Sequence, residues 1–439
     1  MTNRSRGIKV TQPLKDGSSC QVAIVGAGPG GSAAAYHLAQ AGVDVILLEK
    51  SQFPRDKVCG DGLTPHAVRE ILAMGIRPHE EEGWQFNKGL TVIGGGHTLH
   101  LPWPEQESFP GYGMARARTS LDERLAKRAV EAGACLYENS TVVGPITENN
   151  KIVGVQVSQR GADRKKLPPV GIRARYVIDA GGVSARLATS MGIKKLENRP
   201  IAVAARAYFR SPRADEQWME SHLELWDGKP NESNLLPGYG WMFPLGNGLV
   251  NVGLGSVSSD AKATKIAYRK VFQQWVSNLP KEWGFVEENM EGPLRSAALP
   301  MAFNRKPHYR NNLVLVGDSA GMVSPFNGEG IAPAMTSARI AAQCIVQALG
   351  RTNEAGAEKV MQSYPRLVSQ HYGGYYTLGR GFVRLIERPE IMRICTKYGL
   401  GHPGLMSFVH KLLSDGYERR GGDISDRVIQ KLAQVVPKS

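Results

Sequence analysis

Residues 20–50, CQVAIVGAGPGGSAAAYHLAQAGVDVILLEK, decide the fold of this chain. CQVAIVG predicts a buried strand, PGGSAAAYHLAQAG a helix of small residues, and VDVILLEK a second strand. Gly26, Gly28 and Gly31 form G-x-G-x-x-G at the turn between the first strand and the helix. In such a turn one glycine makes the tight bend, one lets the backbone approach a pyrophosphate, and one lets helix and strand pack closely. The segment therefore predicts an α/β domain with a Rossmann-like β-α-β unit.

A single acid marks the end of the second strand. Glu49 stands there, about 20 residues after the glycine turn, where an acid accepts hydrogen bonds from a ribose. Free N–H groups at the start of the helix would meet the phosphates. These features predict a dinucleotide site, and Lys50, which follows Glu49, is expected to contribute to it. The alternative is a glycine-rich turn in an unrelated α/β domain.

A second glycine-rich segment, GDSAGMVSPFNGEG (317–330), follows the apolar strand NNLVLVG. Its first five residues also match G-x-S-x-G, the nucleophile elbow of serine hydrolases, with Ser319 as nucleophile. That elbow requires a helix directly after the serine, whereas Pro325, Gly328 and Gly330 delay the next helix by about ten residues. A serine hydrolase therefore remains only a remote alternative.

The other segments predict two domains and a helical tail. Helices are expected from Thr64 to Met74 and over 120–134, the latter with an acidic first turn that suits the helix dipole. Residues 1–19 are polar and basic and predict a flexible extension. We expect a discontinuous nucleotide-binding domain made of residues 20–90, 112–190 and 295–350. An antiparallel substrate sheet is expected over 91–111 and 191–294, and a C-terminal helical region over 351–439.

Composition narrows the choice of partners. The net charge of +14 favours anionic surfaces, and without zinc-finger spacing or an RNA-recognition signature we expect a membrane surface and no nucleic acid. A charge without any partner is the alternative. Five cysteines without a Cys-x-x-Cys pair predict no metal site and fit a reducing, cytoplasmic compartment. No apolar run is long enough to cross a bilayer, so we expect a peripheral protein at the inner face of the cell membrane.

The tail contains apolar residues between arginines. This pattern predicts an interfacial helix, and a packed amphipathic helix is the alternative. The apolar residues are Phe382, Leu385, Ile386, Ile391 and Met392.

Three separated motifs carry a resemblance to a known family. FPRDKVCGDGLTP (53–65), LPGYGWMFPLGNGLVNVGLG (236–255) and GDSAGMVSPFNGEGI (317–331) occur in the order seen in geranylgeranyl reductase flavoproteins. The chain resembles that family over about residues 20–350, and within it the actinobacterial menaquinone reductases. The family lies in the para-hydroxybenzoate hydroxylase-like superfamily, so the resemblance implies FAD and a Rossmann-like domain of the GR2 or hydroxylase type.

The resemblance also implies roles for particular residues. The K-x-C-G loop would lie beside the flavin, Arg118 and the Gly-Asp pair would contact the phosphates or ribityl chain, and the NGEG turn would lie near N1 and O2 of the ring. The cofactor-binding residues implied in this way are Lys57, Cys59, Gly60, Arg118, Gly317, Asp318, Gly328, Gly330 and Ile331. The aromatic motif would line a lipid pocket with Tyr239, Trp241, Phe243 and Pro244; packing of Trp241 and Phe243 into the core is the alternative. The superfamily's Asp-Gly motif departs here to DAGG, so no nicotinamide contact is assigned to Asp179.

The implied activity is reduction of a C=C bond in an isoprenoid chain, either the tail of menaquinone or a geranylgeranyl lipid. Hydride from flavin N5 and a proton would be added together. The faces of Tyr239 and Trp241 could stabilise the developing cation by about 2 kcal/mol. Cys59 is expected to order the site or relay a proton, with Arg55 and Lys57 favouring its thiolate; a buried structural thiol is the alternative.

Two further activities fit the same residues. A flavin monooxygenase or halogenase would use the same fold, and a non-catalytic flavin protein could carry electrons to membrane quinone. The sequence leaves the electron donor unknown, and we expect a monomer.

Overall fold

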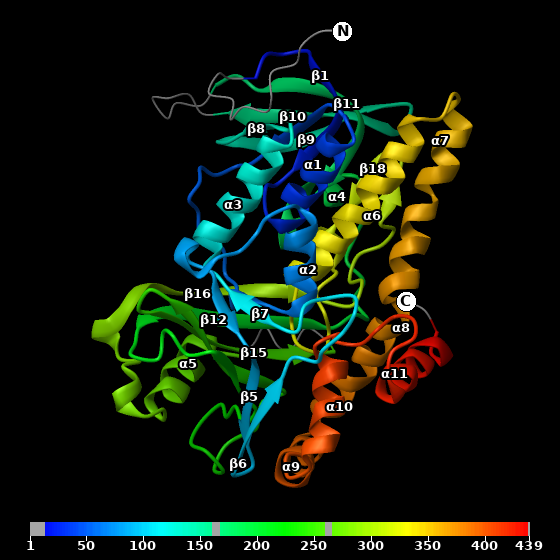
Figure 1. Cartoon of the computed structure of the whole chain (residues 1–439). Coiled ribbons are helices and arrows are strands. Elements are labelled where there is room, and N and C mark those ends of the chain that lie inside the picture. The colour runs from blue at the N-terminus through cyan, green and yellow to red at the C-terminus, as the bar shows by residue number, and fades with distance from the viewer. Residues whose placement is uncertain (1–13, 160–166, 260–265, 438–439) are drawn as a thin grey trace.

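The computed structural model describes residues 14–159, 167–259 and 266–437. The molecule has two stacked halves, and the C-terminal helices run along one side of both (Figure 1). The upper half contains an eight-stranded sheet with its helices, and the lower half a seven-stranded sheet.

The first strand lies inside the eight-stranded sheet. β1 (Ser18–Val25) pairs in parallel with β2 (Val45–Leu48) on one side and β11 (Val170–Asp179) on the other. The parallel strands run in the order β18-β11-β1-β2-β8, and antiparallel strands extend the sheet beyond β18 and β11. The remaining strands are β8 (Cys135–Tyr137), β9 (Ser140–Glu148), β10 (Lys151–Gln159), β17 (Tyr309–Arg310) and β18 (Leu313–Leu315). Val22, Ala23 and Ile24 of β1 and all of β2 are apolar and buried, as expected for parallel strands covered on both faces.

Small residues let the helices of this half approach closely. The buried small residues of α1 (Pro29–Gln40) let α6 (Ile331–Leu349), α3 (Arg118–Glu131) and the sheet pack close to it, and a side-chain carbon at Gly30 would lie 3.3 Å from the carbonyl oxygen of Ala334. The other helices of the half are α2 (Pro65–Ala73), α4 (Arg186–Ser190) and α7 (Glu354–Met361).

The seven-stranded sheet has the order β16-β12-β15-β14-β13-β5-β6, and its neighbours are antiparallel except for β13 and β5. A separate small sheet of three strands, in the order β3-β7-β4, lies beside β14. The strands of both are β3 (Gly62–Leu63), β4 (Gln85–Asn87), β5 (Gly89–Gly94), β6 (His97–Pro102), β7 (Gly113–Ala115), β12 (Ile201–Arg210), β13 (Trp218–His222), β14 (Gly238–Gly246), β15 (Leu249–Ser258) and β16 (Met290–Pro300). The expected boundary of the sheet domain at 294 therefore falls inside β16.

Alternation along the strands separates the two faces of the large sheet. One face packs Phe209, Met242 and Val252 against α5 (Tyr268–Ser277). The opposite face carries Tyr208 and Asn251, which bond to the 53–65 loop of the upper half. The sheet thus turns one face toward its own core and the other toward the nucleotide-binding half.

Two tyrosines of the first long helix of the tail form hydrogen bonds to the upper half. The buried hydroxyl of Tyr364 donates to the Leu315 carbonyl at 2.8 Å, and that of Tyr376 to the Met322 carbonyl at 2.6 Å. The tail consists of α8 (Ser363–Ile386), α9 (Pro389–Ile394), a π-helical turn (Cys395–Gly399), α10 (Pro403–Leu413) and α11 (Ile424–Val435).

Several expectations differ from this structure. β1 begins at Ser18, and Leu14 is buried with its N–H bonded to Gln159 Oε1, so the end of the expected 1–19 extension is packed; residues 1–13 lie outside the described part. The 120–134 helix begins at Arg118 and has no acid in its first turn, because Asp122 lies one turn further and pairs with Arg118.

Most of the apolar residues of the tail pack against the protein, which fits the alternative of a packed amphipathic helix. Of that set only Leu385 is strongly exposed, and Met392 packs with Ile386 against Trp226 and Leu235.

Close packing at the glycine turn predicts an effect on stability. A side-chain carbon at Gly31 would lie 1.8 Å from the Gly26 carbonyl oxygen. We expect Gly31→Ala to lower the free energy of unfolding in urea by about 1–3 kcal/mol or more. Gly381→Ala on α8, where no atom lies within 4 Å, is the control and should stabilise by about 0.5–1 kcal/mol. Equal unfolding of Gly31→Ala and the unsubstituted protein would contradict the prediction.

Candidate functional site: a flavin site facing an aromatic strand

The predicted glycine turn opens toward two arginines. Gly26 has φ +93°, and a side-chain carbon there would collide with the Ala180 carbonyl at 2.6 Å. Gly28 caps α1 without a side chain, and a carbon at this position would lie 3.8 Å from Arg55 Nη2 and 3.9 Å from Arg118 Nη2. A helix N-terminus beside two guanidinium groups is a favourable place for a phosphate.

Acids hold these arginines in place. Arg118 Nε and Nη2 donate to the two oxygens of Asp122 at 2.6 and 2.7 Å, and Arg55 Nη1 donates to the same carboxylate at 2.7 Å. Burial acts to raise the pKa of Asp122, but the guanidinium of Arg118 lowers it below its ordinary value. Glu49 accepts the Ala27 N–H at 3.0 Å and the Ser51 N–H at 3.1 Å, and Arg55 Nη2 lies 3.3 Å from it. Glu49 therefore braces the glycine turn, while Lys50 beside it is exposed.

The second glycine-rich segment meets the first across the parallel sheet, because β18 and β1 both pair with β11. Gly317 has φ +57°, and a side-chain carbon there would lie 2.8 Å from Ala334 Cβ. Asp318 bonds to Lys57 Nζ at 3.2 Å, which joins the K-x-C-G loop to the Gly-Asp pair. Gly328 has φ +76°, and Gly330 caps α6 without a side chain just before Ile331.

The residues around the two glycine turns are suited to bind FAD. Two uncapped helix N-termini, two arginines and an acid at the end of β2 supply donors for phosphates and an acceptor for a ribose. At Gly26 and Gly31 the neighbouring backbone leaves no room for a side chain, whereas Gly28 faces open space beside the two arginines.

The Cys59 loop lies against the aromatic strand. A side-chain carbon at Gly60 would lie 3.1 Å from Phe243 Cε2 and 3.5 Å from Trp241 Nε1. The expectation of a thiolate at Cys59 was wrong: burial raises the pKa of the thiol, and the cation that opposes this rise is Arg118 rather than Arg55 or Lys57. Cys59 is a free, half-buried thiol whose sulfur accepts the Asp61 N–H at 3.3 Å.

The buried Asp61 joins this loop to the large sheet. Its Oδ2 accepts the Tyr208 hydroxyl at 2.7 Å and the Asn251 amide at 2.9 Å. Asn251 also donates to the Cys59 carbonyl and accepts the Trp241 indole N–H. Burial raises the pKa of Asp61 to about 6. Sequence reasoning missed Tyr208 and Asn251, although a lone asparagine between apolar residues of β15 was a usable signal.

The aromatic residues share one face of β14. The ring of Tyr239 lies 6.1 Å from that of Trp241, which lies 6.2 Å from that of Phe243. Tyr239 and Phe243 are half-buried, whereas Trp241 and Pro244 are buried. The Tyr239 hydroxyl donates to the Asn327 carbonyl at 2.6 Å, so the strand is tied to the NGEG turn.

Sequence reasoning used only the backbone of the NGEG turn and missed Glu329. The Thr64 hydroxyl donates to Glu329 Oε1 at 2.7 Å. Burial raises the pKa of Glu329 to about 8, and nearby Asp415 acts in the same direction. A glutamate inside a glycine-rich turn was a weak signal, because its burial depends on contacts from distant segments.

Ser319 lies in a buried 3-10 turn, and α6 begins only at Ile331. Its hydroxyl donates to Asp179 Oδ1 at 3.0 Å; Asp179 also accepts the N–H groups of Gly181 and Ala188. Asp179 therefore holds the DAGG and GDSAG turns together.

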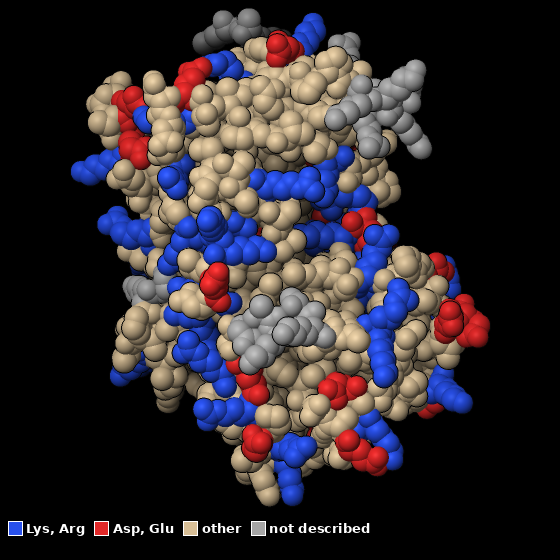
Figure 2. Space-filling view, turned by 180° about the vertical axis from the view of Figure 1, so that it is seen from behind, with Lys and Arg blue, Asp and Glu red and all other residues tan. Residues whose placement is uncertain are grey.

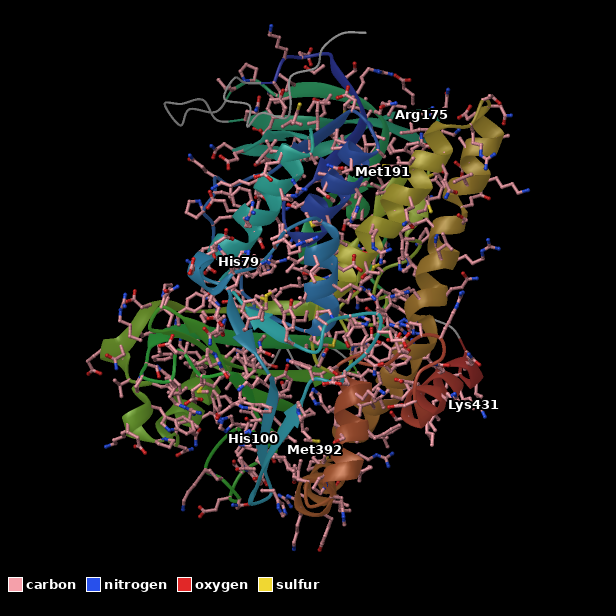
Figure 3. The ribbon with its side chains drawn as sticks, viewed as in Figure 1. His79, His100, Arg175, Met191, Met392 and Lys431 are labelled. Carbon is pink, nitrogen blue, oxygen red and sulfur yellow. The ribbon has the colours of Figure 1, made fainter. Side chains whose placement is uncertain are left out.

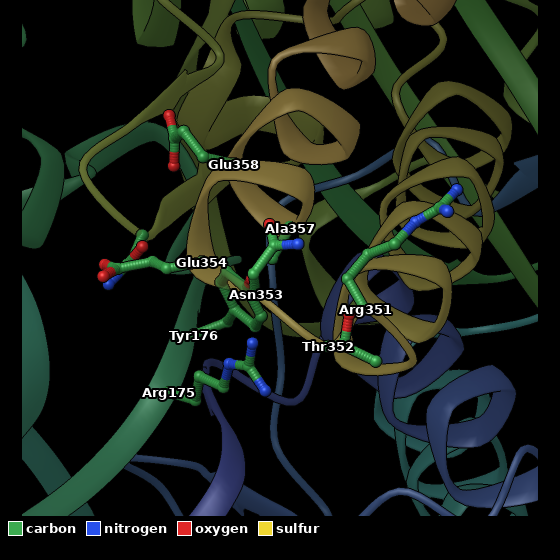
Figure 4. Close-up of a pocket in the computed structure, with 9 residues that line it drawn as sticks. Arg175, Tyr176, Arg351, Thr352, Asn353, Glu354, Ala357 and Glu358 are labelled. Carbon is green, nitrogen blue, oxygen red and sulfur yellow. The ribbon is translucent and has the colours of Figure 1, made fainter.

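A surface cavity of about 340 Å³ lies elsewhere, between β11 and the start of α7 (Figure 4). None of the expected site residues lines it; its charged lining residues are Arg175, Arg351, Glu354 and Glu358. Over residues 14–159, 167–259 and 266–437, no group of three or more His, Cys, Asp and Glu could hold a metal ion.

Comparisons with known proteins agree with this geometry. The family model described as FAD binding domain matches residues 19–367. A menaquinone reductase of Mycolicibacterium smegmatis is 34% identical, with 90% of this chain and 91% of the relative covered. A digeranylgeranylglycerophospholipid reductase of Methanopyrus kandleri is 30% identical over 75% of this chain and 80% of its own. The crystal structure of a geranylgeranyl bacteriochlorophyll reductase-like protein from Thermoplasma acidophilum has the same fold, with TM-score 0.68, 23% identity and coverage of 90% and 99%.

The chain therefore belongs to the FAD binding domain family and, within it, to the geranylgeranyl and menaquinone reductase flavoproteins. It is an FAD-dependent oxidoreductase. The expected fold class and cofactor are confirmed.

Burial of Asp61 predicts a pH-dependent stability. Its pKa rises from an ordinary 3.8 to about 6 on folding, so folding is progressively weakened as pH rises from about 4 to 6 and the cost is constant above. The difference corresponds to about 3 kcal/mol at most. We expect Asp61→Asn to gain stability relative to the unsubstituted protein across this window in urea unfolding at pH 4 to 7. Asp215→Asn controls for loss of an exposed carboxylate; a gain for Asp61→Asn that does not change with pH would refute the prediction.

Proposed function

We propose that the protein saturates a C=C bond in an isoprenoid chain, either the tail of menaquinone or a geranylgeranyl lipid. The relatives named for menaquinone and digeranylgeranyl lipid reduction support this substrate class. The observation that carries the proposal is the row of Tyr239, Trp241 and Phe243, which faces the Cys59 loop.

In this proposal Arg118, Arg55, Glu49 and the two glycine turns hold FAD, and Lys57 and Asp318 lie at its linker. Reduced FAD supplies a hydride equivalent. An isolated alkene has no carbonyl to polarise it, so a proton must be added at the less substituted carbon while positive charge develops on the tertiary carbon. The aromatic faces of Tyr239 and Trp241 stabilise that charge by about 2 kcal/mol in a water-poor site.

Cys59 has an ordering role in this scheme. A thiol whose pKa is raised by burial remains protonated, and it accepts the backbone N–H of Asp61. Cys59 thus fixes the loop that packs against the aromatic row, and it is a weak source of protons.

Reduction of an isoprenoid gives a mass signature that the alternatives lack. We expect anaerobically reduced protein to add two hydrogen atoms to menaquinone or geranylgeranyl lipid. Tyr239→Leu, which removes the aromatic face, should lower the rate about tenfold or more while FAD absorbance is retained. Mass spectrometry of the extracted lipid is the measurement. A need for oxygen would favour a monooxygenase or halogenase, and reduction of the quinone head with an unchanged tail mass would favour an electron carrier.

We further propose that the lower end of the molecule contacts an anionic membrane surface. Leu385, Ile394, Tyr398 and Leu405 have exposed fractions of 50% to 60%, and we call these four residues the tip. The exposed bases Arg384, Arg388, Arg393 and Lys397 alternate with them. Basic and apolar side chains together favour the interface of an anionic bilayer.

The tip is rigidly attached to the sheet domain. Met392 on α9 and His100 on β6 lie at the same end of the molecule (Figure 3). A side-chain carbon at Gly95 would lie 2.4 Å from the Thr396 carbonyl, and Val92 of β5 clusters with Leu400 and Met406.

Lys and Arg outnumber acids on the face seen from behind (Figure 2). Over the described residues no helix is both long and apolar enough to cross a membrane.

Charge substitutions at the tip test the membrane contact. We expect the double variant Ile394→Glu/Leu405→Glu to bind phosphatidylglycerol vesicles at least tenfold more weakly in co-sedimentation, because burial of each side chain contributes about 1.5–3 kcal/mol. Val143→Glu, an equally exposed position on β9 at the other end, is the matched control. Equal binding of the two variants would rule out the tip as the contact.

A further inference from the structure

We propose that the Glu329 carboxyl group is the acid that delivers the proton to the alkene. This inference rests on the proposed function and adds a catalytic residue to it. Glu329 lies in the NGEG turn between Asn327, whose carbonyl accepts the Tyr239 hydroxyl, and Gly330, the cap of α6.

A hydrogen bond from another segment holds the carboxyl group, and contacts within its own turn hold the backbone of Glu329. Thr64, which follows the Cys59 loop, donates its hydroxyl to Oε1 at 2.7 Å. The backbone of Glu329 is held by the Asn327 side chain, which accepts its N–H at 3.0 Å, and by Ser324, whose N–H donates to its carbonyl at 2.8 Å. Burial raises the pKa of Tyr239 to about 12, and the charges of Glu329 and Cys59 both add to this rise. The phenol of Tyr239 is therefore close enough to Glu329 and Cys59 for their charges to affect its pKa.

The surroundings keep this carboxyl group protonated near neutral pH. Burial raises its pKa to about 8, and the carboxylate of Asp415 adds to the rise. The Thr64 hydroxyl and the Ala332 N–H at the start of α6 oppose it and only partly offset the burial. An acid with a pKa near the working pH combines a ready proton with adequate acid strength.

Two other buried groups in the site are poorer donors. The pKa of Asp61 is raised by burial only to about 6, and its Oδ2 is held by Tyr208 and Asn251 as part of the link between loop and sheet. The pKa of the Cys59 thiol is raised from 9.0 by burial, which makes it a weaker acid than a carboxyl group at about 8.

The step balances in atoms and electrons. The O–H bond of Glu329 breaks and a C–H bond forms at the less substituted alkene carbon. The second C–H bond forms at the tertiary carbon with the hydride equivalent supplied by reduced FAD, and the π bond is consumed. The products are a saturated unit, an oxidised cofactor and the Glu329 carboxylate, which regains a proton from water before the next turnover.

Isosteric variants at two positions test the assignment. Glu329→Gln should lower the single-turnover rate of lipid reduction by about 10²–10⁴-fold without loss of FAD absorbance. In the unsubstituted protein the rate should fall as pH rises through about 8, because the acid is then ionised. Thr64→Val removes a hydrogen bond that lowers the pKa, so it should move this fall to higher pH. Glu354→Gln, at an exposed position on α7, is the matched control.

A second readout does not depend on turnover. In infrared spectra of the protein without substrate, the carbonyl band of a protonated carboxyl group should disappear as pH rises through about 8. The band should be missing in Glu329→Gln and should persist to higher pH in Thr64→Val. Unchanged reduction by Glu329→Gln, or a Glu329 band lost near pH 4, overturns the proposal while the function stands. Failure of the unsubstituted protein to reduce any isoprenoid overturns the function itself, whatever the infrared result.

Discussion

The hydrogen-bonded carboxylate of Asp61 joins the two halves of the molecule. It receives Tyr208 from β12 and Asn251 from β15, and it belongs to the loop that carries Cys59. The Asn251 side chain also accepts the indole N–H of Trp241. Because an unpaired polar group buried here would cost about 1–3 kcal/mol, these partners hold the loop at one distance from the sheet. The packing of the Cys59 loop against Trp241 and Phe243 follows from that distance.

Burial sets the protonation of the groups around this loop and the aromatic row. It raises the pKa of Cys59, Tyr239 and Glu329 so that these three groups are uncharged near neutral pH, whereas Asp61, with a pKa of about 6, is ionised there and held by Tyr208 and Asn251. The charges concentrate instead at the phosphate end, where Arg55, Arg118 and their acids pair. A polar end for a dinucleotide and a weakly charged end for a hydrocarbon chain are what an isoprenoid-reducing flavoprotein would need.

Part of the candidate site could be predicted from patterns within single segments of the sequence. The glycine turn and Glu49 at the end of β2 follow from spacing within single segments, whereas the aromatic residues of β14 were implied by the family resemblance. Asn251 and Tyr208 depend on the register of β12 and β15, and the state of Glu329 depends on burial by distant chain. The same limit explains the tail, where Met392 is covered by Trp226 and Leu235, residues far away in sequence, while Ile394 and Leu405 remain exposed.

The sheet also connects the site with the tip. β13 pairs on one side with β14, which carries the aromatic row, and on the other with β5, whose cluster with Leu400 and Met406 supports the tip. Hydrogen-bonded strands form a stiff path, so docking of the tip would hold the aromatic row at a fixed height above the bilayer. A long prenyl chain could then enter the site while part of it stays in lipid. The order of strands in the lower sheet thus connects the aromatic row with the tip through β13 and β5.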